Sequence, residues 1–126
     1  MKKRVLVIDG EESGAKFYRD VFFQTEIEVV ILKEWHAALE LLKSRSVFDG
    51  VIVNCHSIEN NETNLLLEIK TIKPDMLCLV VGNASSHVSI KYIINGEDEF
   101  IESPEENKAS FFNTIIILLD KYDTRF

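Results

Sequence analysis

The sequence predicts a doubly wound α/β domain, in which one parallel sheet carries helices on both faces. Short and nearly continuous apolar runs alternate with segments of helical periodicity along the whole chain. Continuous apolar runs are typical of parallel strands that are buried on both faces. The chain has 126 residues, which is room for one domain and no second core. We therefore expect residues 1–126 to form a single domain.

The apolar runs define the expected strands, which are residues 4–8, 27–32, 50–54, 76–81 and 99–101. Parallel strands in one sheet are joined by right-handed crossovers, usually through a helix. The segments between the runs should therefore be helical. The expected helices are 13–24, 34–44, 63–72, 85–95 and a last helix that begins near residue 105.

Each expected helix has apolar residues at helical spacing. In the first helix, Phe17 and Tyr18 lie four residues before Val21 and Phe22. Pro74 should end the third helix, and Gly96 should cap the fourth. Two longer stripes are Trp35, Ala38, Leu41 and Leu42 in the second helix, and Phe112, Ile115, Ile116 and Leu119 in the last.

Charge and composition exclude several classes of function. The formal net charge is −7, and nucleic-acid affinity comes mainly from cationic side chains on phosphates, so we expect no nucleic-acid partner. No apolar run is long enough to span a bilayer, and the first residues do not resemble a signal peptide. We therefore expect a cytoplasmic protein with no membrane partner. Cys55 and Cys78 lie in apolar strand segments and should be buried free thiols.

Ligands of doubly wound sheets bind beyond the carboxyl ends of the strands. The first expected strand is followed by Asp9, Gly10 and Glu11, and the third ends at Asn54. The fourth strand ends at Val81. The fifth passes through Phe100 and is followed by Ser103 and a proline.

The spacing of these residues resembles that of the response-regulator receiver (CheY-like) family over essentially the whole chain. The stretch from Gly96 to Pro104 is similar to the family pattern Gly-Ala-Asp-Asp-Tyr/Phe-Leu-x-Lys-Pro, and Asp49 lies five residues before the end of its strand, as in the family. The resemblance implies a flavodoxin-like (βα)5 fold with strand order 2-1-3-4-5 and a role in two-component signal transduction or a phosphorelay. It also implies that Phe100 is the aromatic switch residue.

The chain departs from the family where the chemistry is done. The family's acidic pair corresponds to Asp9 and Gly10, and its phosphorylated aspartate corresponds to Asn54. Its Thr or Ser at the fourth strand corresponds to Val81, and its Lys before the proline corresponds to Ser103. The resemblance therefore implies a degenerate phosphorylation pocket.

The lost groups have clear chemical consequences. The amide of Asn54 cannot attack phosphorus to form an aspartyl phosphate. Mg²⁺ is usually held by one or two carboxylates, and Asp9 is nearly alone once the acids at positions 10 and 54 are lost. Val81 and Ser103 supply no charge to a phosphoryl group. We expect no catalytic residue, no enzymatic activity, no cofactor and no metal.

The predicted function is that of a pseudo-receiver that binds proteins without being phosphorylated. The partner would be a kinase, an effector or a second copy in a homodimer, and no small-molecule substrate is expected. In the receiver family the fourth helix, fifth strand and last helix often form the docking face. The side chains expected to be exposed on this face are Val88, Lys91, Ile94, Phe111 and Leu118.

Two alternatives remain. One is an atypical regulator that is still phosphorylated or binds a metal at a remodelled site, with Glu11 or His56 completing the ligands. For Glu11 the competing interpretation is a favourable charge at a helix start. The other alternative is a flavodoxin-like carrier of FMN, and the acidic turn 9–12 argues against it because it would repel a phosphate.

Overall fold

A parallel sheet organises the residues that the computed structural model describes, which are 3–45, 47–54, 65–82, 99–102 and 107–121. Its strands are β1 (Lys3–Ile8), β2 (Ile27–Leu32), β3 (Gly50–Asn54), β4 (Leu77–Gly82) and β5 (Glu99–Glu102). All neighbouring strands are parallel, and their order is β2-β1-β3-β4-β5. The predicted flavodoxin-like α/β class and strand order are therefore confirmed.

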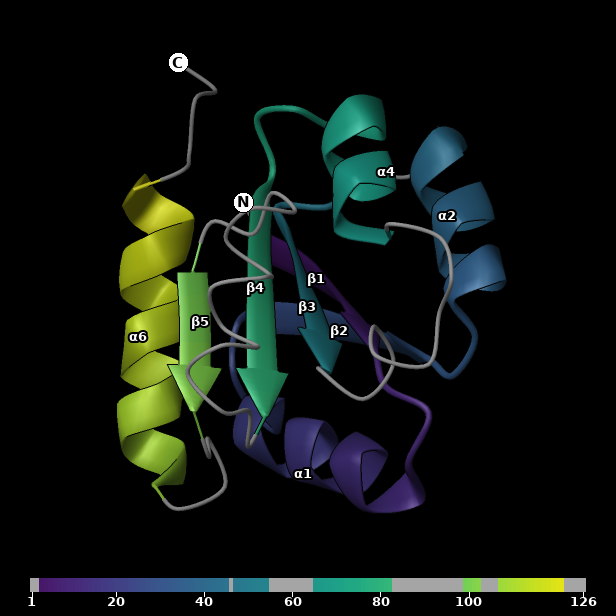
Figure 1. The fold of residues 1–126 in the computed structure, drawn as a ribbon. Coiled ribbons are helices and arrows are strands. Elements are labelled where there is room, and N and C mark those ends of the chain that lie inside the picture. The colour runs from purple at the N-terminus through teal and green to yellow at the C-terminus, as the bar shows by residue number, and fades with distance from the viewer. Residues whose placement is uncertain (1–2, 46, 55–64, 83–98, 103–106, 122–126) are drawn as a thin grey trace.

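Helices cover both faces of this sheet (Figure 1). They are α1 (Glu12–Phe22), α2 (Trp35–Lys43), α4 (Leu65–Ile72) and α6 (Lys108–Lys121). The helix predicted at 85–95, with Gly96 as its cap, lies outside the described residues. Pro74 follows the end of α4 by two residues, as predicted. Within the described part of the chain, no helix combines the length and apolar character needed to cross a membrane.

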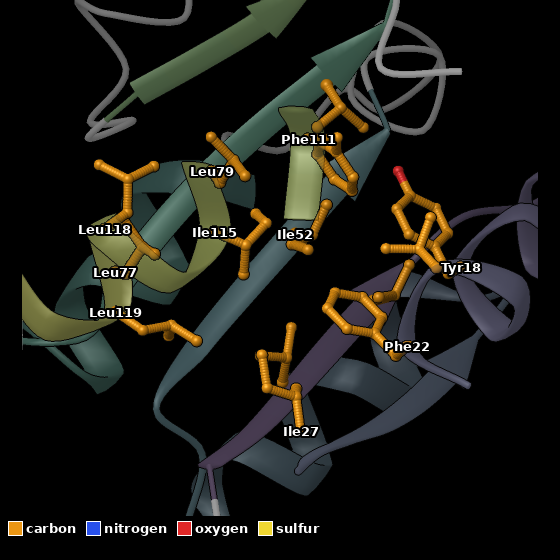
Figure 2. Close-up of a cluster of buried hydrophobic side chains, with 14 residues drawn as sticks. Tyr18, Phe22, Ile27, Ile52, Leu77, Leu79, Phe111, Ile115, Leu118 and Leu119 are labelled. Atoms are coloured by element: carbon orange, nitrogen blue, oxygen red, sulfur yellow. The ribbon is translucent and has the colours of Figure 1, made fainter. Parts of the chain in front are cut away.

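Side chains alternate between the two faces of each strand, so the sheet separates two hydrophobic cores. On one face, Leu6, Ile8, Val51, Val53 and Val80 pack with buried residues of α2 and α4. This core also contains Cys78, a buried thiol that forms no disulfide, as predicted. Cys55 lies outside the described residues. The other core, drawn in Figure 2, lies between the sheet and helices α1 and α6. Its members include Val5, Val7, Tyr18, Phe22, Ile52, Leu77, Leu79, Phe111, Ile115, Leu118 and Leu119.

The prediction that Phe111 and Leu118 are exposed on the outer side of the last helix is wrong. Phe111 is 3% exposed and Leu118 is 6% exposed, and both belong to the core between the sheet, α1 and α6 (Figure 2). The ring centroid of Phe111 lies 5.6 Å from that of Phe17 and 6.2 Å from that of Tyr18. Contact with the aromatic residues of α1 therefore turns Phe111 inward. The exposed apolar side chains of α6 are instead Ile116 and Ile117.

Asp49 fixes the start of β3 against β1. Its backbone N–H donates to the carbonyl oxygen of Arg4 at 2.7 Å, and its carboxylate Oδ2 accepts from the N–H of Arg4 at 2.7 Å. The Arg4 guanidinium also lies 4.6 Å from the ring centroid of Phe48. This acid lies before β3, at the sheet edge opposite to Asn54, so its role is to hold two strands in register.

Helix α1 ends in a turn that places Gln24 in the left-handed region, with φ at 57°. Two backbone hydrogen bonds close the turn, from Phe23 N–H to the Asp20 oxygen and from Thr25 N–H to the Phe22 oxygen. A side chain in this region costs about 1 kcal/mol relative to glycine.

We therefore expect Gln24→Gly to raise the free energy of unfolding by about 1 kcal/mol in urea denaturation, because the glycine removes the Cβ strain. Gln24→Val is the matched control and should lower the free energy of unfolding, because a β-branched residue tolerates positive φ poorly. A lower stability for Gln24→Gly than for the wild type would contradict this account.

Candidate functional site

The carboxyl edge of the sheet brings three of the predicted site residues together. Ile8 pairs with Val53 in the sheet, so Asp9 and Asn54 each lie one residue beyond that pair. Asn54 in turn pairs with Val81. Asp9 continues the alternation of Val5 and Val7, and Asn54 that of Ile52, which places both on the α1 side of the sheet.

Asp9 is the buried charged residue of this edge, with 1% of its surface exposed. Its Oδ1 accepts a hydrogen bond from the backbone N–H of Glu11 at 2.9 Å, which closes an Asx turn. Its Oδ2 accepts a hydrogen bond from the side-chain amide of Asn54 at 3.2 Å. Position 54, which corresponds to the phosphorylated aspartate of the receiver family, therefore carries a hydrogen-bond donor that is directed at Asp9.

Gly14 is a site residue that the sequence analysis missed. A Cβ at this position would lie 2.5 Å from Cγ and 2.9 Å from Oδ1 of Asp9, and closer still to Oδ2. No side chain fits there, so the carboxylate packs directly against the backbone of the first turn of α1. The signal in the sequence was a glycine early in a helix that follows an acid at a strand end, and glycine is unfavourable inside helices.

The position of α1 also favours a negative charge on Asp9. The helix begins at Glu12, only three residues beyond Asp9. The first N–H groups of a helix have no partner within the helix, and its dipole is positive at this end. The buried carboxylate thus lies near the positive end of the α1 dipole and accepts hydrogen bonds from the Glu11 N–H and the Asn54 amide.

The other predicted residues add no acid to this pocket. Val81 is buried in the core between the sheet, α1 and α6, and Gly10 is exposed. Glu11 is also exposed, and its contact with Asp9 is made by its backbone N–H. This agrees with the helix-start interpretation of Glu11.

Several predicted positions lie outside what the structure describes. Ser103, His56, Val88, Lys91 and Ile94 are among the residues whose structure is not described. Phe100 pairs with Val80 as part of β5, and its side chain is not described. The roles predicted for these residues stay predictions.

A divalent cation, which the receiver resemblance implies beside the acidic pair, does not fit the residues around Asp9. Cations need oxygen lone pairs, and Asn54 presents its N–H to the carboxylate. Gly14 leaves Asp9 pressed against α1, and Gly10 supplies no ligand. Among the described residues, no three His, Cys, Asp or Glu side chains are grouped so that they could hold a metal ion.

Comparisons with known proteins identify the fold. No protein-family model matches the sequence, and no curated protein matches it. Solved structures do match over nearly the whole chain. A CheY-like response regulator receiver domain protein from Methanospirillum hungatei JF-1 is 21% identical, with a TM-score of 0.82 over 97% of this chain and 97% of that chain.

Two further neighbours agree. The beryllofluoride-activated NtrC4 receiver domain, whose solution structure is a dimer, is 26% identical, with a TM-score of 0.83 over 98% of this chain and 100% of that chain. A response regulator from Thermotoga maritima is 19% identical, with a TM-score of 0.83 over 95% of this chain and 99% of that chain.

The parallel sheet, its strand order and its two helical layers define a flavodoxin-like α/β domain. Within that class, the chain has the fold of the CheY-like response-regulator receiver domains, which confirms the resemblance found in the sequence.

Proposed function

We propose that this chain is a signal-transduction receiver-like module that has lost aspartyl phosphorylation and acts by binding a protein partner. The observation that carries the proposal is the contact at the end of β3, where the Asn54 amide donates to Asp9 Oδ2 at 3.2 Å. An acyl phosphate needs a carboxylate at this point, and an amide that is engaged as a donor cannot provide one.

The surroundings of Asn54 support the same proposal. The paired residue on β4 is Val81, a buried apolar side chain that cannot donate a hydrogen bond to a phosphoryl oxygen. The position of the family's lysine is Ser103, which carries no charge. The proposal assigns no enzymatic reaction and no cofactor to the chain.

A receiver domain signals by shifting between two states, and one without phosphorylation has only its surface left for signalling. The partner we propose is therefore a protein: a kinase, an effector or a second copy. The dimeric NtrC4 receiver domain supports this class of partner. The burial of Phe111 and Leu118 moves the proposed contact on α6 to Ile116 and Ile117, which are 36% and 66% exposed.

Phosphorylation is tested by incubation with acetyl phosphate and Mg²⁺, followed by intact-mass measurement. We expect no phosphoryl adduct, because position 54 lacks a carboxylate nucleophile. A receiver domain with an intact pocket, treated in parallel, is the control that shows the reagent is active. A stoichiometric adduct that is lost on base treatment would refute the proposed function.

A further inference from the structure

The hydrogen bond from Asn54 to Asp9 bears on the energetic cost of burying the Asp9 carboxylate. A buried ionised carboxylate is unfavourable unless hydrogen bonds or an opposite charge compensate for the lost water. Asp9 is 1% exposed, and its carboxylate accepts hydrogen bonds from two neutral N–H groups, those of Glu11 and Asn54.

The side chain at position 54 decides whether this pocket needs a proton or a cation beside Asp9. A second carboxylate there would lie about where the amide now is, 3.2 Å from Asp9 Oδ2. Two carboxylates at that separation repel each other and need a proton or a cation between them. The Asn54 amide places a partial positive charge at the same point, so residue 54 attracts the Asp9 carboxylate instead of repelling it.

We propose that the Asn54 amide does for Asp9 what a bound divalent cation does for two facing carboxylates, and so holds this sheet edge in one cation-independent state. Gly14 supports the assignment, because the absence of a side chain there lets Asp9 lie against α1 while Oδ2 of Asp9 still accepts from Asn54. The inference deepens the proposed function and rests on it in one respect: a module that is not phosphorylated needs no second, phosphorylated state.

The test compares melting temperatures in EDTA and in millimolar Mg²⁺. For the wild type we expect nearly the same value in both, since only a ligand that prefers the native state raises the melting temperature. For Asn54→Asp we expect a fall of roughly 5 °C or more in EDTA. Mg²⁺ should restore much of this loss, and calorimetric titration should then detect Mg²⁺ binding.

A swapped pair separates this role from a merely structural one. In the double variant Asp9→Asn with Asn54→Asp, the introduced amide can still accept from Glu11 N–H and can donate to the carboxylate at position 54. We expect it to recover the stability lost by Asn54→Asp in EDTA, with no response to Mg²⁺. Asn54→Ala is the matched control, which should lose stability without gaining a response to Mg²⁺.

Three results would overturn the inference. One is a wild-type melting temperature that Mg²⁺ raises by several degrees. Another is an Asn54→Asp variant as stable as the wild type in EDTA and unresponsive to Mg²⁺. The third is a swapped pair no more stable than Asn54→Asp, which decides the matter even if the single variant is unfolded in EDTA. A phosphoryl adduct on the wild type would refute the proposed function and leave these melting temperatures unchanged.

Discussion

Replacement of Gly14 by alanine is expected to destabilise the domain, although Gly→Ala inside a helix ordinarily stabilises a protein by about 1 kcal/mol. The new Cβ would lie 2.5 Å from Cγ of Asp9, so the carboxylate would have to leave its position. It would then lose the hydrogen bonds from Glu11 and Asn54, and charge-assisted bonds contribute roughly 1.5–3 kcal/mol each. We expect Gly14→Ala to lower the free energy of unfolding by about 2–4 kcal/mol in urea denaturation.

Two controls make this prediction specific. Gly10→Ala adds the same methyl group where the nearest heavy atom, the Lys33 carbonyl oxygen, is 3.8 Å away, so the change should stay within about 0.5 kcal/mol. In an Asp9→Ala background the obstructing carboxylate is gone, and Gly14→Ala should then be neutral or stabilising. If Gly14→Ala is at least as stable as the wild type when Asp9 is present, the packing of Asp9 against α1 is not as described.

The strands were predictable because their signal is local. β2 and β3 have the predicted bounds, Ile27–Leu32 and Gly50–Asn54, and the other strands differ from the prediction by a residue at one or both ends. The central strands β3 and β4 are nearly continuous apolar runs, as expected for strands that are buried on both faces. The location of the candidate site was predictable from the same signal, because the carboxyl ends of parallel strands lie at the same edge of the sheet.

The contacts within the site were not predictable in the same way. The sequence showed that Asp9 and Asn54 follow neighbouring strands, but not that the amide of one would donate to the carboxylate of the other. The role of Gly14 depends on how closely α1 packs against Asp9, so the sequence could mark the position but not show the contact. A search for glycines in the first turn after an acidic strand end would have found the position.

The orientation of α6 was predicted wrongly for a related reason. A helix that is apolar nearly all round has no single stripe that sets which side faces the core. The predicted stripe included Phe112 and Ile116, whereas the buried side chains are Phe111, Ile115, Leu118 and Leu119. Contact with Phe17 and Tyr18 of α1 turns Phe111 inward. Phe112 is partly buried against the same core, with its ring centroid 6.0 Å from that of Phe22, so of the predicted stripe only Ile116 is exposed.

The orientation of α6 can be tested by placing a charge at Leu118 and at its neighbour Ile117, and the effect at Leu118 should be large. Leu118 is 6% exposed inside the core shown in Figure 2, and Ile117 is 66% exposed on the outer side of the same helix. Leu→Ala changes in cores cost about 2–5 kcal/mol, and a buried, unpaired ammonium adds to that cost. We expect Leu118→Lys to lower the free energy of unfolding by at least about 3–5 kcal/mol, enough to unfold a marginally stable domain.

Ile117→Lys is the matched control, because it places the same charge one residue away on the exposed side of α6. It should change the free energy of unfolding by no more than about 0.5 kcal/mol and leave the circular dichroism spectrum unchanged. If the two variants were equally stable, the helix would have to face the other way, with the original prediction for Leu118 correct.

Because Ile117→Lys preserves the fold, it is also the variant with which to test the proposed partner contact. Charge in an apolar interface is strongly disruptive, so self-association measured by light scattering, or capture of a purified kinase or effector, should weaken markedly if α6 forms the contact. Unchanged binding by this folded variant would place the partner on another surface of the domain.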